Sequence, residues 1–142
     1  MSSCRVEVCP EPFDPWHQLA SWSGDAAAAA IFIGRVRSTT MDGRPLQALE
    51  LEHFPGLCER QITAMAQRLK QEHNVVSILV LHRVGRLLPG EPIVLVAVQA
   101  DRRGAAQRCS SLLLEELKHH APFWKREWCS DQGTWLTKNT PL

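Results

Sequence analysis

The apolar residues of this chain fall into short runs separated by turn residues, and this pattern constrains the fold most. Residues 75–84 and 92–100 are two such runs, VVSILVLHRV and PIVLVAVQA, and the turn sequence LPGE lies between them at residues 88–91. Runs of this length suit buried strands, and none reaches the roughly 18 apolar residues that a membrane-spanning helix needs. The chain is therefore expected to build its core around a sheet of short strands.

Three further segments are predicted to be helices. After Pro55 and Gly56, apolar residues recur three or four positions apart and share one helical face, namely Cys58, Ile62, Met65 and Leu69. A second face follows Asp101, the expected N-cap, and precedes Pro122, the expected stop; it comprises Ala105, Cys109, Leu112, Leu113 and Leu117. A third, short helix is predicted after Asp14 and Pro15, with Asp14 as its N-cap.

Alternating or β-branched segments predict the other strands. They lie at residues 5–9, 26–37, 46–54, 124–129 and 134–137, the last two around a turn at residues 131–133. Strands and helices interleave without repeats or linkers. We predict a mixed α+β fold with a partly antiparallel sheet. We also expect a single domain over residues 1–142, because a chain of this length corresponds to one domain.

Charge and cysteine usage exclude several classes of function. Sixteen Lys and Arg against fifteen Asp and Glu leave a net charge of +1, which argues against nucleic-acid and membrane-surface binding. The five cysteines include no CxxC pair, which argues against a zinc ribbon or a thioredoxin-like motif. No HExxH motif or cysteine cluster is present either, so no metal site is expected, and no cofactor is expected. The first five residues do not resemble the start of a signal peptide, and free thiols suit a cytoplasmic protein.

Two lysines bracket one short segment near the end of the chain. Lys118 lies at the end of the predicted helix and Lys125 on the strand that follows, so both can face one pocket, with Phe123 and Trp124 as apolar walls. A lysine beside another cation or apolar walls can lose its proton and act as a nucleophile or as an acid–base group. The alternative is a helix C-terminus whose cations only offset the helix dipole.

Two arginine pairs are candidates for binding an anionic substrate. Arg102 and Arg103 lie where a strand ends and a helix begins, where free N–H groups and the helix dipole favour an anion. Arg35 and Arg37 share one face of a predicted strand, and Phe32 is assigned to the same side. The alternative for each pair is a solvated surface.

Histidines, a cysteine and tryptophans are further candidates for the site or for the core. His53 follows a strand and can line a pocket, with a structural role as the alternative, whereas His82 is interpreted as structural. Cys129 lies near Lys125 and Arg126 and is kept as an alternative nucleophile. The tryptophans at positions 124, 128 and 135 are expected to pack in the core.

Five segments resemble the large, catalytic subunit of molybdopterin synthase, in the right order between residues 27 and 135. The most specific is KHHAPFWKRE at residues 118–127; the others are FIGRVR at 32–37, LELEHFPG at 49–56, HRVG at 82–85 and LPGE at 88–91. The resemblance implies an α/β hammerhead-type fold and a homodimer. It also implies a small ubiquitin-like partner subunit at each end, which makes the assembly a heterotetramer.

The same resemblance implies a reaction. The partner's C-terminal Gly-Gly tail carries a thiocarboxylate, enters the pocket and supplies two sulfurs to cyclic pyranopterin monophosphate, which becomes molybdopterin. Lys118 matches the catalytic lysine of the family, and Lys125 matches a second active-site lysine. Arg37 and Arg103 match arginines that line the pterin and phosphate pocket, and Phe32 matches an apolar wall. A neighbouring subunit is a further source of pocket residues.

Two positions depart from the family pattern. Arg102 stands where many members carry histidine, so it can bind an anion but cannot shuttle a proton at pH 7. Phe54 stands at the tyrosine of an EHYPG-type segment, so the chemistry does not need a hydroxyl there. Arg102 and His53 complete the expected substrate-binding residues. The rival hypothesis is a non-catalytic scaffold or regulatory module that binds the ubiquitin-like partner, and Lys118 and Lys125 on opposite faces would favour it.

Overall fold

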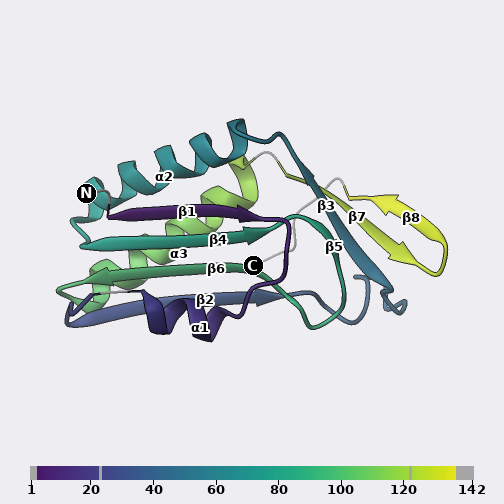
Figure 1. Ribbon diagram of the computed structural model, residues 1–142, viewed down its shortest axis with the longest axis horizontal. Coiled ribbons are helices and arrows are strands. Elements are labelled where there is room, and N and C mark those ends of the chain that lie inside the picture. The colour runs from purple at the N-terminus through teal and green to yellow at the C-terminus, as the bar shows by residue number, and fades with distance from the viewer. Residues whose placement is uncertain (1–2, 23, 122, 137–142) are drawn as a thin grey trace.

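The computed structural model describes residues 3–22, 24–121 and 123–136, which form three helices and two four-stranded sheets (Figure 1). The helices are α1 (Pro15–Ser21), α2 (Leu57–His73) and α3 (Arg103–His120). The strands are β1 (Cys4–Cys9), β2 (Ala28–Arg35), β3 (Ala48–His53), β4 (Ser77–Arg83), β5 (Gly85–Leu87), β6 (Pro92–Ala100), β7 (Phe123–Cys129) and β8 (Gln132–Trp135). The predicted mixed α+β class is confirmed.

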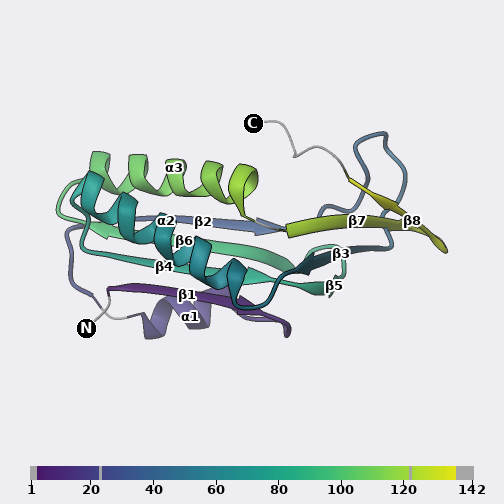
Figure 2. The ribbon, with the colours of Figure 1, turned by 90° about the horizontal axis from the view of Figure 1, so that it is seen from above.

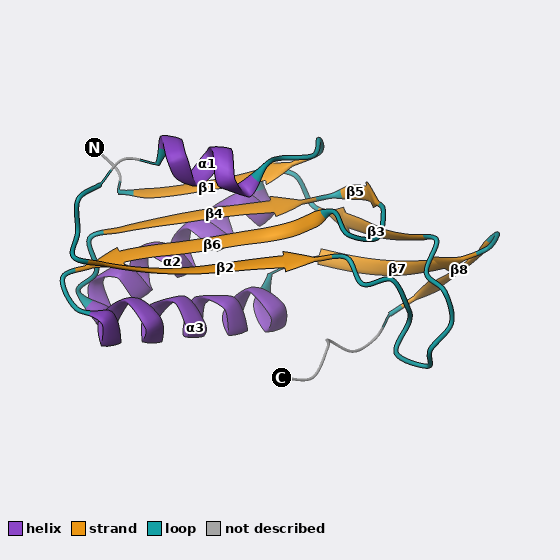
Figure 3. Ribbon diagram, turned by 90° about the horizontal axis from the view of Figure 1, so that it is seen from below, coloured by secondary structure: helices purple, strands orange, loops and turns teal. Residues whose placement is uncertain are grey.

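The first sheet has the strand order β1-β4-β6-β2, in which only β1 and β4 pair in parallel. Helices α2 and α3 cover one face of this sheet and α1 covers the other (Figures 2 and 3). Because side chains alternate along a strand, β4 sends Ile78 and Val80 toward the two long helices and Leu79 and Leu81 toward α1. A strand buried on both faces explains why residues 75–84 read as a nearly continuous apolar run.

The second sheet extends beyond the end of the first (Figure 1). Its order is β5-β3-β7-β8, and all of its pairs are antiparallel. The register sets Leu51 opposite Lys125 and His53 opposite Phe123. A small core of Leu49, Leu51 and Leu87 lies under this sheet. The two sheets thus leave a junction where β2 ends and β7 begins.

Helix termini follow local sequence rules. The Asp14 carboxylate accepts hydrogen bonds from the backbone N–H groups of Trp16 and His17, so the predicted N-cap is confirmed. Gly56 precedes α2 with φ +83°, a conformation that favours glycine, and its N–H donates to the Glu59 carboxylate at 2.7 Å. These contacts fix where α2 starts relative to β3.

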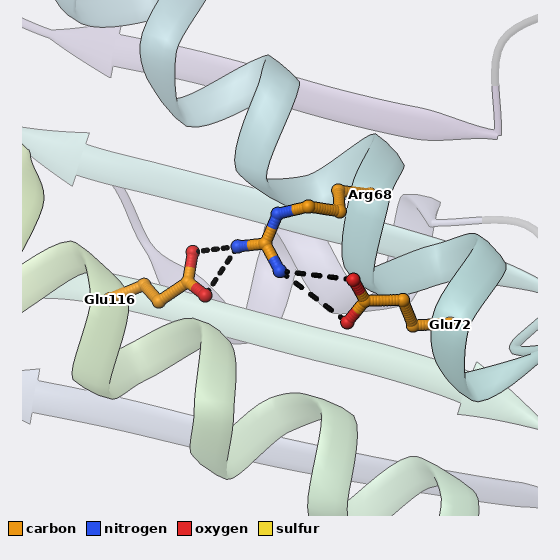
Figure 4. A network of polar contacts seen from close by, with 3 residues as sticks. All are labelled: Arg68, Glu72 and Glu116. Atoms are coloured by element: carbon orange, nitrogen blue, oxygen red, sulfur yellow. Dashed lines mark hydrogen bonds and ion pairs between the residues drawn. The ribbon is translucent and has the colours of Figure 1, made fainter.

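An exposed arginine connects the two long helices. Arg68 of α2 forms ion pairs with Glu72, one turn further along the same helix, and with Glu116 of α3 (Figure 4). Beneath this contact, the buried side chains of Leu69 and Leu113 contribute to the main core. Exposed ion pairs contribute little to the free energy of folding compared with a buried leucine, so the packing beneath holds α3 in place.

Several expectations at element ends were wrong. Helix α3 begins at Arg103 with Arg102 at its N-cap position, so Asp101 lies one residue too early to cap it. Strand β5 was missed because it has only three residues. Gln132 and Gly133 already belong to β8, so the turn falls at Ser130 and Asp131. Leu112 is exposed on α3. The expectations for Pro122 and Thr137 lie outside the described residues.

The tryptophans do not form a core. Trp124 and Trp135 are each almost half exposed, and Trp128 is half-buried. The Arg126 guanidinium lies over the rings of Trp128 and Trp135, 4.9 and 4.3 Å from their centroids, and pairs with Glu50 at 2.9 Å. These rings pack on a charged side chain at the surface, because no helix of the described residues covers this face of the second sheet. No helix among the described residues is long and apolar enough to cross a membrane.

Candidate active site

A cavity of about 370 Å³ lies at the junction of the two sheets. In Figure 2 the ends of α3 and β2 lie beside the start of β7, and these three elements supply half of the residues that line the cavity. The lining residues include Phe32, Gly34, Arg35, Val36 and Arg37 from β2 and the segment after it, Leu117, Lys118 and Ala121 from the end of α3, His82 from β4, and Phe123, Lys125 and Glu127 from β7.

Both predicted catalytic lysines face this cavity. Alternation along β7 turns Phe123, Lys125 and Glu127 inward and leaves Trp124 on the opposite face. Lys118 reaches the same space from the last turn of α3. The expectation that Trp124 forms a pocket wall is therefore wrong, since its ring packs edge-on against exposed Phe54 at a centroid distance of 5.0 Å.

Lys125 holds its proton less tightly than an exposed lysine does. Burial lowers the pKa of Lys125 below its ordinary value, and the positive charge of Lys118 lowers it further. Both causes act in the same direction, because each disfavours the charged ammonium. Lys125 therefore gives up its proton more readily than an exposed lysine does. A shared cavity argues against the scaffold hypothesis, which expects the two lysines on opposite faces.

The arginine segment after β2 is held by backbone hydrogen bonds. The Val36 N–H donates to Glu91 O at 2.9 Å, and the Gly90 N–H donates to Val36 O at 2.8 Å. Glu91 is in turn paired with the buried guanidinium of Arg83 at 2.9 Å. This chain of contacts fixes the backbone between Arg35 and Arg37, whose side chains line the cavity.

Phe32 and Arg35 both line the cavity, although residues three positions apart lie on opposite faces of a regular strand. The pairing of β2 with β6 is irregular here, because the register shifts between Gly34 and Arg35 where Ile93 is the extra residue of a bulge on β6. Gly34 also leaves room for the Phe32 ring, because a Cβ atom there would stand only 3.2 Å from Phe32 Cε1. Phe32 thus lies beside the arginines as predicted, but not through the simple strand alternation on which the prediction relied.

His82 lines the cavity although the sequence suggested only a structural role. Its ring is buried and stacks on Phe123, with ring centroids 3.9 Å apart and an interplanar angle of 13°. Its Nδ1 lies 2.8 Å from Arg83 O. Burial lowers the pKa of His82 to about 4, and the charge of Lys125 adds to this effect. The only sequence signal was its place in an HRVG segment at the end of an apolar strand.

Three predicted substrate-binding residues are not among the described residues that line the cavity. Arg102 and Arg103 are exposed at the N-terminal end of α3, about 22 Å along the helix from Lys118. His53 lies behind Phe123, with its Nε2 at 3.7 Å from the Glu59 carboxylate. Cys129 also lies outside the lining residues, as do the buried thiols of Cys58 and Cys109.

The local charge of the cavity differs from that of the whole chain. Among the described lining residues, Lys118, Lys125, Arg35 and Arg37 are cations and Glu127 is a carboxylate. Such an excess of positive charge beside apolar walls favours an anion that also carries a flat or apolar part. Within the described residues, no three His, Cys, Asp or Glu side chains gather so that they could hold a metal ion.

Fold and cavity together define an α+β protein with a cationic, partly buried pocket for an anionic ligand. The family model described as MoaE protein matches residues 8–120. The molybdopterin synthase catalytic subunit of Cereibacter sphaeroides is 40% identical over 135 residues, which cover 93% of this chain and 90% of that protein. The chain therefore belongs to the MoaE family, and the predicted resemblance and the prediction of an enzyme subunit are confirmed.

Solved structures agree with this assignment. The molybdopterin biosynthesis MoaE protein from Burkholderia ambifaria is 33% identical and superposes with a TM-score of 0.76, covering 96% of this chain and 89% of that one. A protein–protein complex of subunits 1 and 2 of molybdopterin-converting factor from Helicobacter pylori contains a chain with the same fold, at a TM-score of 0.77 and 18% identity. That match covers 98% of this chain and 93% of the other.

Proposed function

We propose that this chain is the catalytic subunit of a molybdopterin synthase, a sulfurtransferase that converts cyclic pyranopterin monophosphate to molybdopterin. The observation that carries the proposal is the convergence of Lys118, Lys125 and Arg37 on one cavity of a MoaE-family chain. The fused rings of the substrate suit the apolar walls, and its phosphate suits the cations.

The sulfur donor in this proposal is a small ubiquitin-like subunit with a C-terminal Gly-Gly tail that ends in a thiocarboxylate. The Helicobacter pylori complex of two subunits supports a partner of this kind. A donated sulfur also explains why no cysteine is among the described lining residues. Each thiocarboxylate sulfur forms a bond to a pterin side-chain carbon, where a C–O bond breaks. Hydrolysis of the resulting thioester then breaks the acyl C–S bond, so that the tail ends in a carboxylate.

The two lysines take different parts in this reaction. Lys118, at the helix end, positions the thiocarboxylate and acts as an acid–base group. Lys125, half-buried in the same cavity, stabilises negative charge that develops on the substrate and can also exchange a proton, because its pKa is lowered. Arg37 and Phe32 hold the phosphate and the ring system. We place the reaction in the cytoplasm.

Arg102 and Arg103 require a second copy of the chain. Because they lie about 22 Å along α3 from Lys118, their side chains do not reach the cavity of their own chain. We propose a homodimer with a small subunit at each end. In this dimer, the N-terminus of α3 from one copy of the chain completes the cavity of the other copy. His53 acts indirectly through the Phe123 ring that it stacks on.

A reconstitution experiment tests the proposed function. The protein is mixed with a thiocarboxylated ubiquitin-like subunit and cyclic pyranopterin monophosphate, and the dithiolene product is measured. We expect product with the thiocarboxylated tail and none with a carboxylate tail. Binding of the small subunit without product, for a donor that is competent with another synthase, would instead support the scaffold alternative.

A further inference from the structure

Strand β2 forms an edge of the first sheet that no described segment covers. Figure 3 looks onto this edge, and β2 runs along its length between α1 on one side and α3 on the other. One side of β2 pairs with β6. In an edge strand, the backbone N–H and C=O groups of every second residue point away from the sheet. The outer side of β2 therefore presents hydrogen-bonding groups to which another strand can pair.

The sequence of β2 lacks the features that usually keep an edge strand from pairing. Between Ala28 and Gly34 it holds no charged residue and no proline, and Ile31 is 49% exposed in the middle of this stretch. Edge strands in solvent are usually protected by charged residues, proline or a bulge. Strand β1, at the opposite edge, carries an exposed ion pair between Arg5 and Glu7. Strand β1 therefore suits an edge in solvent, whereas β2 suits a covered edge.

Helix α3 has a face that runs beside this edge and joins the two ends of the proposed site. Lys118 and Leu114 line the cavity, and the same face continues at helical spacing through Ser111 and Gln107 to Arg103. It turns away from α2, because the residue that pairs with α2, Glu116, lies on the other side of the helix. A second α3 that runs antiparallel along this face brings its Arg103 beside Lys118 of the first.

We propose that two copies of this chain pair edge to edge through antiparallel β2 strands, which joins their four-stranded sheets into one continuous sheet. The proposal rests on the homodimer of the proposed function and specifies the surface that forms it. The regular part of β2 ends at Gly34, where the register with β6 shifts, so the segment Ala28–Gly34 is centred on Ile31. The two-fold axis then passes between the Ile31 residues of the two copies, which lie opposite each other.

The strand register carries the second helix to the cavity. With Ile31 on the axis, Ala28 of one copy lies opposite Gly34 of the other, and Gly34 lines the cavity. Ala28 also pairs with Ala100 of its own chain, only three residues before α3 begins at Arg103. The N-terminus of one α3 is thus placed at the cavity of the other copy, where its arginines add positive charge for an anionic substrate.

A charge on the axis tests the interface. Ile31→Lys sets two like charges opposite each other, and Ile31 is not among the lining residues of the cavity. Glu7→Lys, which adds a lysine to the opposite edge, is the matched control. In sedimentation, we expect wild type and Glu7→Lys to be dimers and Ile31→Lys to dissociate at least ~100-fold more readily. Circular dichroism checks that the variants are folded. An Ile31→Lys protein that is folded and remains as dimeric as wild type would overturn the proposal.

Hydrogen exchange on the wild-type protein needs no variant to fold. In the dimer, consecutive amides of β2 should all be protected, as in a central strand, because both of its sides are paired. Fast exchange at every second residue of β2 would overturn the proposal. Product formation separates this result from the proposed function. If β2 is protected but a competent donor gives no product, the proposed function fails and the interface stands. If a monomeric wild type makes product, the interface fails and the proposed reaction stands.

Discussion

Gly34 shows how one missing side chain shapes the cavity. A Cβ atom at this position would stand 3.0 Å from Val94 Cγ1 and 3.2 Å from Phe32 Cε1, closer than ordinary contacts. We predict that Gly34→Ala displaces the Phe32 ring and raises KM for the pterin substrate several-fold while the protein remains folded. Steady-state kinetics and a thermal melt check this, and an unchanged KM would show that Phe32 does not contact the substrate.

The buried histidine also predicts how stability depends on pH. His82 titrates near 6.5 in an unfolded chain and at about 4 in the folded protein. Between these pH values the unfolded chain binds a proton that the folded protein does not. The contribution of His82 to the free energy of unfolding is therefore complete above pH 6.5 and is lost as the pH falls toward 4. We expect wild type to lose about 3 kcal/mol more than His82→Phe over this range. Parallel urea denaturation curves at pH 7 and pH 4.5 measure the difference, and equal losses would contradict buried neutrality.

At the scale of elements, one buried ion pair links the turn between β5 and β6 to the arginines of the cavity. Arg83 is 3% exposed and pairs with Glu91, whose backbone carbonyl accepts the Val36 N–H. We predict that Glu91→Ala, which leaves a buried charge unpaired, destabilises the fold by ~1–3 kcal/mol and weakens substrate binding. Glu72→Ala, on the exposed α2 surface, is the control. Equal binding by both variants would show that the turn does not position Arg37.

The central strands and the long helices could be predicted from the sequence, because their local apolar pattern agrees with how they pack. Residues 94–100 are buried, and so are Cys58, Ile62 and Leu69 of the predicted helical face, as the sequence pattern indicates. The bulge at Gly34 and the three-residue β5 could not be predicted, since both depend on pairing with distant strands. Trp124 and Trp135 were misplaced because bulky apolar residues usually pack inside, and the second sheet leaves this face uncovered.

The site was predictable to the extent that it lies on one continuous segment. Lys118 and Lys125 were placed correctly because a helix end and the following strand can only meet at their junction. The position of His82 on the cavity wall could not be predicted, because a histidine in an apolar run looks the same whether its ring faces the core or a cavity. The prediction that Arg102 and Arg103 share a pocket with the lysines neglects the length of α3, which separates the two ends of this helix.

At the scale of the whole molecule, the proposed dimer makes a complementation prediction. A mixture of Lys118→Ala and Arg103→Ala chains, each almost inactive alone, forms mixed dimers in which one cavity has both intact residues. Random exchange should restore about one quarter of wild-type activity. If Arg103 acted within its own chain, the mixed dimers would remain inactive, so the absence of recovery after verified subunit exchange would contradict a shared site.

The most direct test of the central claim compares two lysines in the reconstituted complex. Single-turnover formation of dithiolene product is followed for wild type, Lys118→Ala and Lys70→Ala. Lys70 is the matched control, because it lies in the last turn of α2 and is not among the lining residues of the cavity. We expect Lys118→Ala to lose at least ~100-fold in rate while it still binds the small subunit, since a positioned acid–base group contributes about that much or more. Lys70→Ala should match wild type. Equal rates for wild type and both variants would contradict the assignment of the cavity as the site of sulfur transfer.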